Sequence, residues 1–356
     1  MIELEWLPAV DDWSARLTQA RSSDSPDWPA LRSLAASSID FLQTDRLDRV
    51  LGKTFAGAPP EGLAAPVVRI AVTGSATLSH LAPALRIAAA RRNMWAEVHV
   101  GEYGQYHQEL EDPDSALWQF NPTALLIALD ARHLFARQLN SAEEAAGHVA
   151  QLLDRCEALW AKARARGLHV IHQTAMPVLP QLAGNNEHRV GWSAAGTLAV
   201  YNEALRARAD AAGVDLLDLS PAIAADGLKL WHDPALWHRA KQEVTIRAAP
   251  AYGDLVMRLI AARAGRSAKC LVLDLDNTLW GGVIGDDGLA GIVLGQGNAA
   301  GEAHLALQAY ARDLTRRGVI LAVCSKNDEA NALEPFDQHP DMLLRRSDIA
   351  CFVANW

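Results

Sequence analysis

From Val67 onward, short runs of apolar and β-branched residues alternate with longer stretches of helical character. The runs read VVRIAV, AEVHV, TALLIALD, LHVIHQT and VDLLDL. They are continuously apolar, which is typical of strands buried on both faces. Strands that alternate with amphipathic helices form a parallel sheet covered by helices. The pattern therefore predicts an α/β domain built on a parallel sheet.

The chain of 356 residues is long enough for more than one domain. Residues 1–65 form a helical segment, in which Pro29 occupies a first-turn position and apolar residues follow at helical spacing to Leu42. A second short helix follows Thr44. After a linker rich in glycine and proline, residues 66–265 form the α/β domain. A second α/β unit, 268–356, has room for about two strand–helix repeats and is expected to be incomplete.

Composition excludes several classes of function. A net charge of −9 argues against binding to nucleic acid or to anionic membranes. The four cysteines lack the spacing of a zinc site or a disulfide framework, so we expect reduced thiols. The N-terminus does not resemble a signal peptide, and no apolar run approaches the ~18 residues of a membrane span. We therefore expect a cytoplasmic protein.

The stretch KCLVLDLDNTLWGGVIGDDG carries Asp274 and Asp276 at the end of an apolar run. Residues two apart in a strand point to the same side, so both carboxylates are expected at the carboxyl end of a parallel strand, where ligands bind. Two adjacent carboxylates repel each other unless a proton or a cation lies between them. Mg²⁺ prefers one or two carboxylates together with water and phosphate oxygens. The pair therefore predicts a magnesium site at Asp274 and Asp276.

The sequence DLDNT resembles the DxDx[TV] signature of the haloacid dehalogenase superfamily. The resemblance implies that Asp274 is a nucleophile toward phosphorus and that Asp276 is the general acid and base. It also implies that Asn277, Thr278 and, in VCSKN, Ser325 serve phosphate binding and the loop around it. Acidic residues after a strand also occur simply as turn formers and helix caps, and Asn277 and Thr278 would suit a turn.

The stretches LWGGVIGDDG, VCSKND and DPALWHRAKQ resemble the FkbH-like group, subfamily IIIC of that superfamily, whose members carry an N-terminal domain related to SGNH hydrolases. The resemblance implies dephosphorylation of 1,3-bisphosphoglycerate and loading of a glyceryl unit on the phosphopantetheine arm of an acyl carrier protein in polyketide biosynthesis. It also implies an acyl-enzyme thioester, which we assign to Cys324. The alternative is that Cys324 is a small buried residue at a strand end.

The superfamily pattern further requires a lysine and, later in the chain, an acidic pair at the end of a further strand. Between Ser325 and Trp356 the sequence has no lysine except Lys326, and it has no such strand with a terminal acidic pair. We therefore expect a chain truncated at its C-terminus or an impaired site. Two other functions stay open. One is a magnesium-dependent phosphohydrolase of a small phosphorylated metabolite. The other is a carrier-protein-binding module with an inactive remnant.

A second candidate site lies in the larger domain. Ser75 in VTGSATL occupies the position of an SGNH nucleophile, Gly101 that of the glycine donor, and Asp130 replaces the usual asparagine. Asp233 and His238 are the nearest substitutes for the usual DxxH pair. Because a serine without a correctly spaced base is a weak nucleophile, the alternative is that Ser75 forms a tight turn and caps a helix. We expect this domain to bind the carrier protein or its arm.

Overall fold

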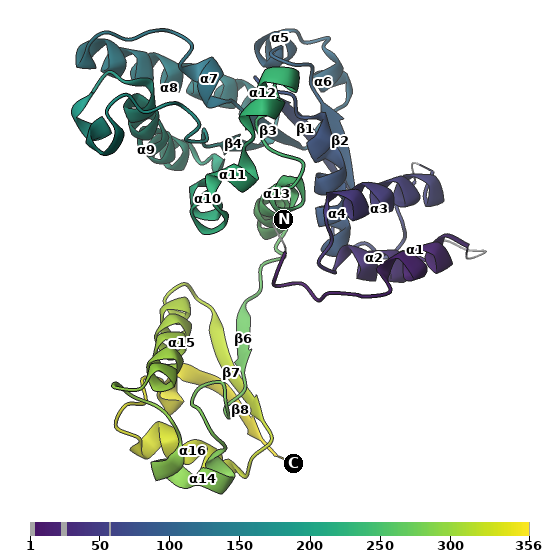
Figure 1. Ribbon diagram of the computed structural model, residues 1–356. Helices are drawn as coiled ribbons and strands as arrows, with labels where there is room; N and C mark the ends of the chain where they lie inside the picture. Colours follow the sequence, from purple (N-terminus) through teal and green to yellow (C-terminus); the bar gives the residue numbers. More distant parts are fainter. Residues whose placement is uncertain (1–3, 23–26, 57, 356) are drawn as a thin grey trace. The chain divides into compact units, whose positions relative to one another are not determined.

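The computed structural model describes residues 4–22, 27–56 and 58–355. The chain divides into two compact units, residues 1–264 and 265–356. Figure 1 shows the helices and strands of each unit. In the part of the chain that the structure describes, no helix combines the length and apolarity needed to cross a membrane.

The first unit is built on a parallel sheet of five strands in the order β2-β1-β3-β4-β5. This is the strand order of flavodoxin-like folds. β3 is buried at every position, as its continuously apolar sequence predicts. The strands are β1 (Val68–Gly74), β2 (Ala96–Val100), β3 (Ala124–Ala128), β4 (His169–Gln173) and β5 (Asp215–Leu217).

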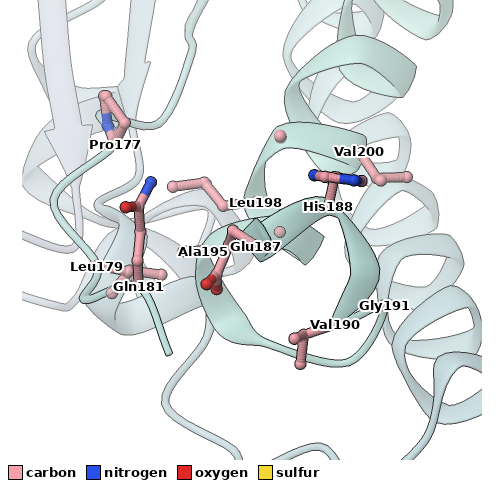
Figure 2. Close-up of a pocket in the computed structure, with 12 residues that line it drawn as sticks. Pro177, Leu179, Gln181, Glu187, His188, Val190, Gly191, Ala195, Leu198 and Val200 are labelled. Atoms are coloured by element: carbon pink, nitrogen blue, oxygen red, sulfur yellow. The ribbon is translucent and has the colours of Figure 1, made fainter. Parts of the chain in front are cut away.

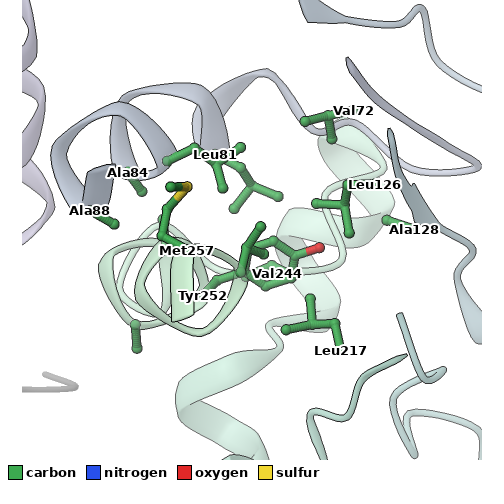
Figure 3. Packing of buried hydrophobic residues seen from close by; sticks show 14 of the residues in the cluster. Val72, Leu81, Ala84, Ala88, Leu126, Ala128, Leu217, Val244, Tyr252 and Met257 are labelled. Carbon is green, nitrogen blue, oxygen red and sulfur yellow. The ribbon is translucent and has the colours of Figure 1, made fainter. Parts of the chain in front are cut away.

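Helices cover both faces of this sheet. One face packs against α4 and α13, through residues such as Ala84 and Met257 (Figure 3). The opposite face packs against α8 and α9. The α-helices of this layer are α4 (Ala82–Arg91), α5 (Tyr106–Glu111), α6 (Ala116–Gln119), α7 (Ala131–Leu134), α8 (Ala142–Ala165), α9 (Ala194–Ala212), α10 (Ser220–Asp226), α11 (Leu228–Trp231), α12 (Pro234–Ala240) and α13 (Ala249–Arg263).

The contact between α4 and α13 depends on a glycine. A β-carbon at Gly253 would lie 2.6 Å from backbone atoms of Ala84, so only glycine permits this approach. Beside it, the buried Asp254 carboxylate forms ion pairs with Arg91 and Arg92 of 2.5 and 2.9 Å. The two helices are therefore fixed by both a close backbone approach and a buried ion-pair cluster.

Three helices precede the sheet: α1 (Trp13–Ser22), α2 (Trp28–Ala35) and α3 (Phe41–Thr54). The helix predicted around Pro29 ends at Ala35, before Leu42. A new helix begins after Asp40 because this residue forms a capping box with Gln43. The Asp40 side chain accepts a hydrogen bond from the Gln43 backbone amide, and Gln43 Oε1 accepts one from the Asp40 backbone amide. The three helices share a hydrophobic cluster with α4.

The second unit has a three-stranded parallel sheet in the order β6-β7-β8. The third strand goes beyond the two strand–helix repeats expected from sequence, because the short run IACFVA pairs with β7. The strands are β6 (Cys270–Leu273), β7 (Ile320–Ser325) and β8 (Ile349–Ala354), and the helices are α14 (Ile284–Gly291), α15 (Ala299–Thr315) and α16 (Glu329–Gln338). Short 3₁₀ turns complete both units: Ser79–Leu81, Gly184–Arg189 and Arg346–Asp348.

Candidate functional site

Asp274 and Asp276 follow the carboxyl end of β6, as the sequence predicts. Asp276 is held by three donors. Its Oδ1 accepts hydrogen bonds of 3.0 Å from Trp280 Nε1 and from the Ile284 amide. Its Oδ2 accepts a bond of 2.9 Å from Asn327 Nδ2. The carboxylate is therefore fixed in position, with one lone pair on Oδ2 left open.

Asp274 differs from its neighbour. Its side chain is exposed, and Oδ1 accepts a bond of 2.8 Å from the Leu275 amide. Among the residues that the structure describes, Oδ2 has no protein partner. One carboxylate is thus anchored and the other is open to solvent, which suits one oriented acid or base and one nucleophile.

The loop after the aspartates is shaped by Asn277 and Thr278. Asn277 adopts φ of 55°, and its Oδ1 accepts a bond of 3.0 Å from the Gly282 amide. The Thr278 carbonyl accepts a bond of 2.8 Å from His304 Nδ1. In this structure the Asn277 side chain is engaged in closing the loop, and its assignment to phosphate binding stays a prediction.

At the end of β7, Ser325 is buried, and its Oγ accepts a bond of 3.2 Å from Asn327 Nδ2. Asn327 thus links Ser325 to Asp276. Asn327 is not among the residues predicted from the sequence, although its place two residues after Ser325 in VCSKND is the signal that could have found it.

Cys324 is exposed, so the alternative of a buried strand-end cysteine is wrong. Leu273 pairs with Val323 in the parallel register of β6 and β7. The next residues along the two strands are Asp274, which follows β6, and Cys324, which is the last but one residue of β7, so both lie at the same end of the sheet.

The donor set fits a magnesium ion with few protein ligands. Within residues 4–22, 27–56 and 58–355, no group of three or more His, Cys, Asp or Glu gathers as a metal site. Asp274 and Asp276 nevertheless supply two carboxylates, each with an oxygen able to coordinate a cation. Mg²⁺ commonly binds through one or two carboxylates and completes its shell with water and phosphate oxygens.

In the first unit, Ser75 and Asp130 bind each other. The hydroxyl and the carboxylate Oδ2 of Asp130 lie 2.6 Å apart, and the Asp130 amide donates to Ser75 Oγ at 2.8 Å. The Ser75 amide donates to the Ala128 carbonyl at 3.2 Å. Neither the hydroxyl nor the amide of Ser75 is therefore free in this arrangement to attack or to stabilise an oxyanion.

Gly101 is also occupied. Its amide donates to the Val72 carbonyl at 2.8 Å. The Glu109 carboxylate fills the space beside it, since a β-carbon on Gly101 would lie 2.2 Å from Glu109 Oε2. Glu109 is held there by Thr73 Oγ1 at 2.7 Å and by the Glu102 amide at 3.1 Å. A carboxylate at this point repels an oxyanion, so the expected oxyanion hole is not assembled.

Among the described residues, no hydrogen bond joins Asp233 or His238 to Ser75. Asp233 caps α12 by accepting a bond of 2.8 Å from the Ala235 amide, and His238 is exposed on the same helix. The histidine of this segment that is buried is His232, whose Nδ1 lies 2.8 Å from the Glu243 carbonyl. Burial lowers the pKa of His232.

Glu243 is a second residue that sequence reasoning missed. The Glu243 carboxyl group is buried close to the negative charge of Asp130. Burial is the larger cause and the Asp130 charge the smaller, and together they raise the pKa of Glu243 to about 8. Gln173 Nε2 donates to Glu243 Oε2 at 3.2 Å, and Tyr252 in turn donates to Gln173 Oε1 at 2.6 Å. The position of the expected hydrolase site is thus a closed polar network in which Glu243 is neutral at pH 7.

Comparison with known structures places these two sites in context. The chain is similar to the N-terminal part of the protein BF1531 from Bacteroides fragilis, a crystal structure that contains a phosphatase domain complexed with Mg. The TM-score is 0.79 at 29% sequence identity, over 89% of this chain and 82% of that one. Two α/β units, with parallel sheets of five and of three strands, follow one another along the chain.

Weaker similarities fall on smaller parts of the chain. A lipase/acylhydrolase from Enterococcus faecalis matches with a TM-score of 0.36 at 14% identity, over 55% of this chain and 96% of that one. The acetyl xylan esterase AlAXEase matches with the same TM-score and identity, over 54% of this chain and 100% of that one. No protein-family profile and no curated protein sequence matches.

Proposed function

We propose that the protein is a magnesium-dependent phosphohydrolase that forms a phosphoenzyme intermediate on Asp274. The observation that carries the proposal is the contrast between the two aspartates. Asp276 is held by three donors, whereas Asp274 is exposed and, among the described residues, only its Oδ1 has a protein partner. Similarity to a structure containing a phosphatase domain complexed with Mg supports both the reaction and the metal.

In the proposed reaction, an Asp274 carboxylate oxygen attacks the phosphorus, and the bond from phosphorus to the leaving-group oxygen breaks. Asp276 donates a proton to that oxygen. Asp276 then takes a proton from a water molecule, which attacks the phosphorus and releases inorganic phosphate and the Asp274 carboxylate. Asp274 and Asp276 would hold the Mg²⁺, which neutralises charge on the phosphoryl oxygens when bound. The Ser325 hydroxyl lies at the end of the neighbouring strand β7 and is suited to bind a phosphoryl oxygen.

A narrower proposal follows from the exposed thiol of Cys324 at the edge shared with Asp274. The Cys324 sulfur attacks the acyl carbon of 1,3-bisphosphoglycerate, the carbon–oxygen bond to phosphate breaks, and a thioester forms. The remaining phosphoryl group is transferred to Asp274 as its bond to the glyceryl oxygen breaks, and water then releases it as inorganic phosphate, as in the first reaction. The glyceryl unit then passes to the thiol of a phosphopantetheine arm on an acyl carrier protein, which restores Cys324.

Two assays separate these proposals. Release of phosphate from small phosphorylated acids, with Mg²⁺ or with EDTA, tests the hydrolase, and Asp274→Asn should abolish both turnover and a borohydride-trapped phosphoaspartate. Activity that persists in Asp274→Asn would contradict it. Incubation with 1,3-bisphosphoglycerate and carrier protein tests transfer by mass spectrometry. Cys324→Ser should keep phosphate release and lose the mass-shifted carrier; an unchanged carrier signal in that variant would exclude the thioester step.

A further inference from the structure

A cavity of about 520 Å³ in the first unit lies between α5, α7 and α8, at the end of β3. It belongs to neither of the sites described above. We propose that it binds a small amphiphilic organic anion, with an aliphatic body and a carboxylate or phosphate head.

The inner wall of the cavity is apolar. Leu129, Leu134, Leu152 and Leu159 line it, and each is buried. Cys156 lines it as well, and burial raises the pKa of its thiol to about 11. The wall therefore carries no charge at pH 7, and an aliphatic chain placed against it removes apolar surface from water.

The mouth of the cavity is cationic. Arg137 and Arg155 line it and are exposed. In the part of the chain that the structure describes, neither guanidinium forms an ion pair or a hydrogen bond. The one carboxylate in the lining, Glu111, is neutralised by Lys162 at 2.5 Å. Two guanidiniums beside a neutralised carboxylate attract an anionic head group, to which arginine can donate two parallel hydrogen bonds.

Polar groups with fixed positions lie beside the arginines. Tyr106 and His133 both line the cavity, and the tyrosine hydroxyl lies 3.0 Å from His133 Nε2. The His133 amide in turn donates to Asp130 Oδ1 at 2.9 Å, which ties the start of α7 to the buried Ser75–Asp130 pair. The polar side of the mouth is therefore held in place before a ligand arrives.

A second cavity of the same unit provides a matched control. It has about 540 Å³ and is lined by residues after β4 and at the start of α9, among them Leu179, Val190 and Leu198 (Figure 2). Its lining contains the Glu187 carboxylate and no arginine or lysine. We expect this cavity to reject anions. Ala158 of the first cavity and Ala199 of the second are both exposed helix residues, so each can be replaced by tryptophan to fill one cavity alone.

The test is calorimetric titration of the full chain with octanoate, octyl phosphate and neutral 1-octanol. EDTA is present throughout, so that phosphoryl transfer at Asp274 cannot consume octyl phosphate and the result is independent of the proposed function. We expect saturable binding of at least one anion. Ala158→Trp should abolish it, and Ala199→Trp should leave it unchanged. Replacement of Arg137 and Arg155 together by glutamine should weaken anion binding about tenfold or more and leave any binding of octanol unaltered.

Three results would overturn the proposal: no saturable binding of either anion, loss of binding in Ala199→Trp instead of Ala158→Trp, or octanol binding as tightly as the anions. The preferred head group, carboxylate or phosphate, is read from the relative affinities of the two anions. Circular dichroism of each variant verifies that the fold is retained.

Discussion

Asn327, after β7, donates a hydrogen bond of 2.9 Å from Nδ2 to Oδ2 of Asp276, after β6. The same amide group lies 3.2 Å from Ser325 Oγ. Two strand ends that are far apart in sequence are therefore joined by one side chain. If Asp276 is the acid and base of the proposed reaction, its orientation depends on this amide.

The first prediction concerns that amide. Asn327→Ala removes the donor to Asp276, and we expect kcat for phosphate release to fall about tenfold or more, since orientation of a reacting carboxylate is lost. Steady-state kinetics on a small phosphorylated acid measures the change. Asn140→Ala, which removes an exposed amide from the first unit, is the control and should leave kcat unchanged. Equal kcat in both variants would show that Asn327 does not position Asp276.

The two aspartates are predicted to differ in their effect on stability. Asp276→Asn places an amide group among three donors, so one donor loses its acceptor and we expect a loss of roughly 1–3 kcal/mol in the free energy of unfolding. Asp274→Asn alters an exposed side chain and should change it by about 0.5 kcal/mol or less. Denaturant titration without metal compares the two. A larger loss in Asp274→Asn would contradict the assignment of the anchored carboxylate.

Glu243 predicts a pH dependence of stability. Its pKa is raised to about 8 in the folded protein, so between its ordinary pKa near 4.5 and pH 8 the folded state holds a proton that the unfolded state has lost. The stability from this group is present at low pH and declines as the pH rises toward 8. Glu243→Gln cannot ionise, and we expect it to flatten the decline. Unfolding measured at intervals from pH 5 to 8 tests this, and equal slopes in both proteins would refute it.

A pair of glycines tests the contact between α4 and α13. Gly253→Ala places a β-carbon 2.6 Å from the Ala84 backbone, and we expect a loss of roughly 1–3 kcal/mol. Gly147→Ala, within α8, meets nothing within 4 Å and should stabilise the protein by roughly 0.5–1 kcal/mol, because alanine favours helix. Thermal unfolding of the two variants should therefore shift in opposite directions. Shifts in the same direction would contradict the close approach.

The sequence predicts the first sheet well because its strands are apolar runs that can be recognised without knowledge of their partners. β3 is an example: all five of its residues are buried. β8 is longer than β3, but none of its six residues is fully buried, and it gains its strand character from pairing with β7, a tertiary contact that periodicity does not report.

The candidate sites also differ in this way: residues placed by the local sequence are predicted, and residues placed by tertiary contacts are not. Asp274 and Asp276 are found from sequence because adjacency and a strand end suffice to place them. His232 and Glu243 are not, because their burial depends on segments far apart in the chain. His232 lies in extended conformation between α11 and α12 and turns inward, whereas His238 lies on the exposed side of α12. A lone glutamate in KQEV carries no sign in the sequence that it will be buried.

The mutual satisfaction of Ser75 and Asp130 has a practical consequence for surveys of enzymes. Fluorophosphonate reagents label serines whose hydroxyl is activated by a base, and the Ser75 hydroxyl is instead committed to a neighbouring carboxylate. The protein should stay unlabelled in such a survey. A count of serine hydrolases based on the domain fold would therefore include this protein, whereas a count based on fluorophosphonate labelling would not.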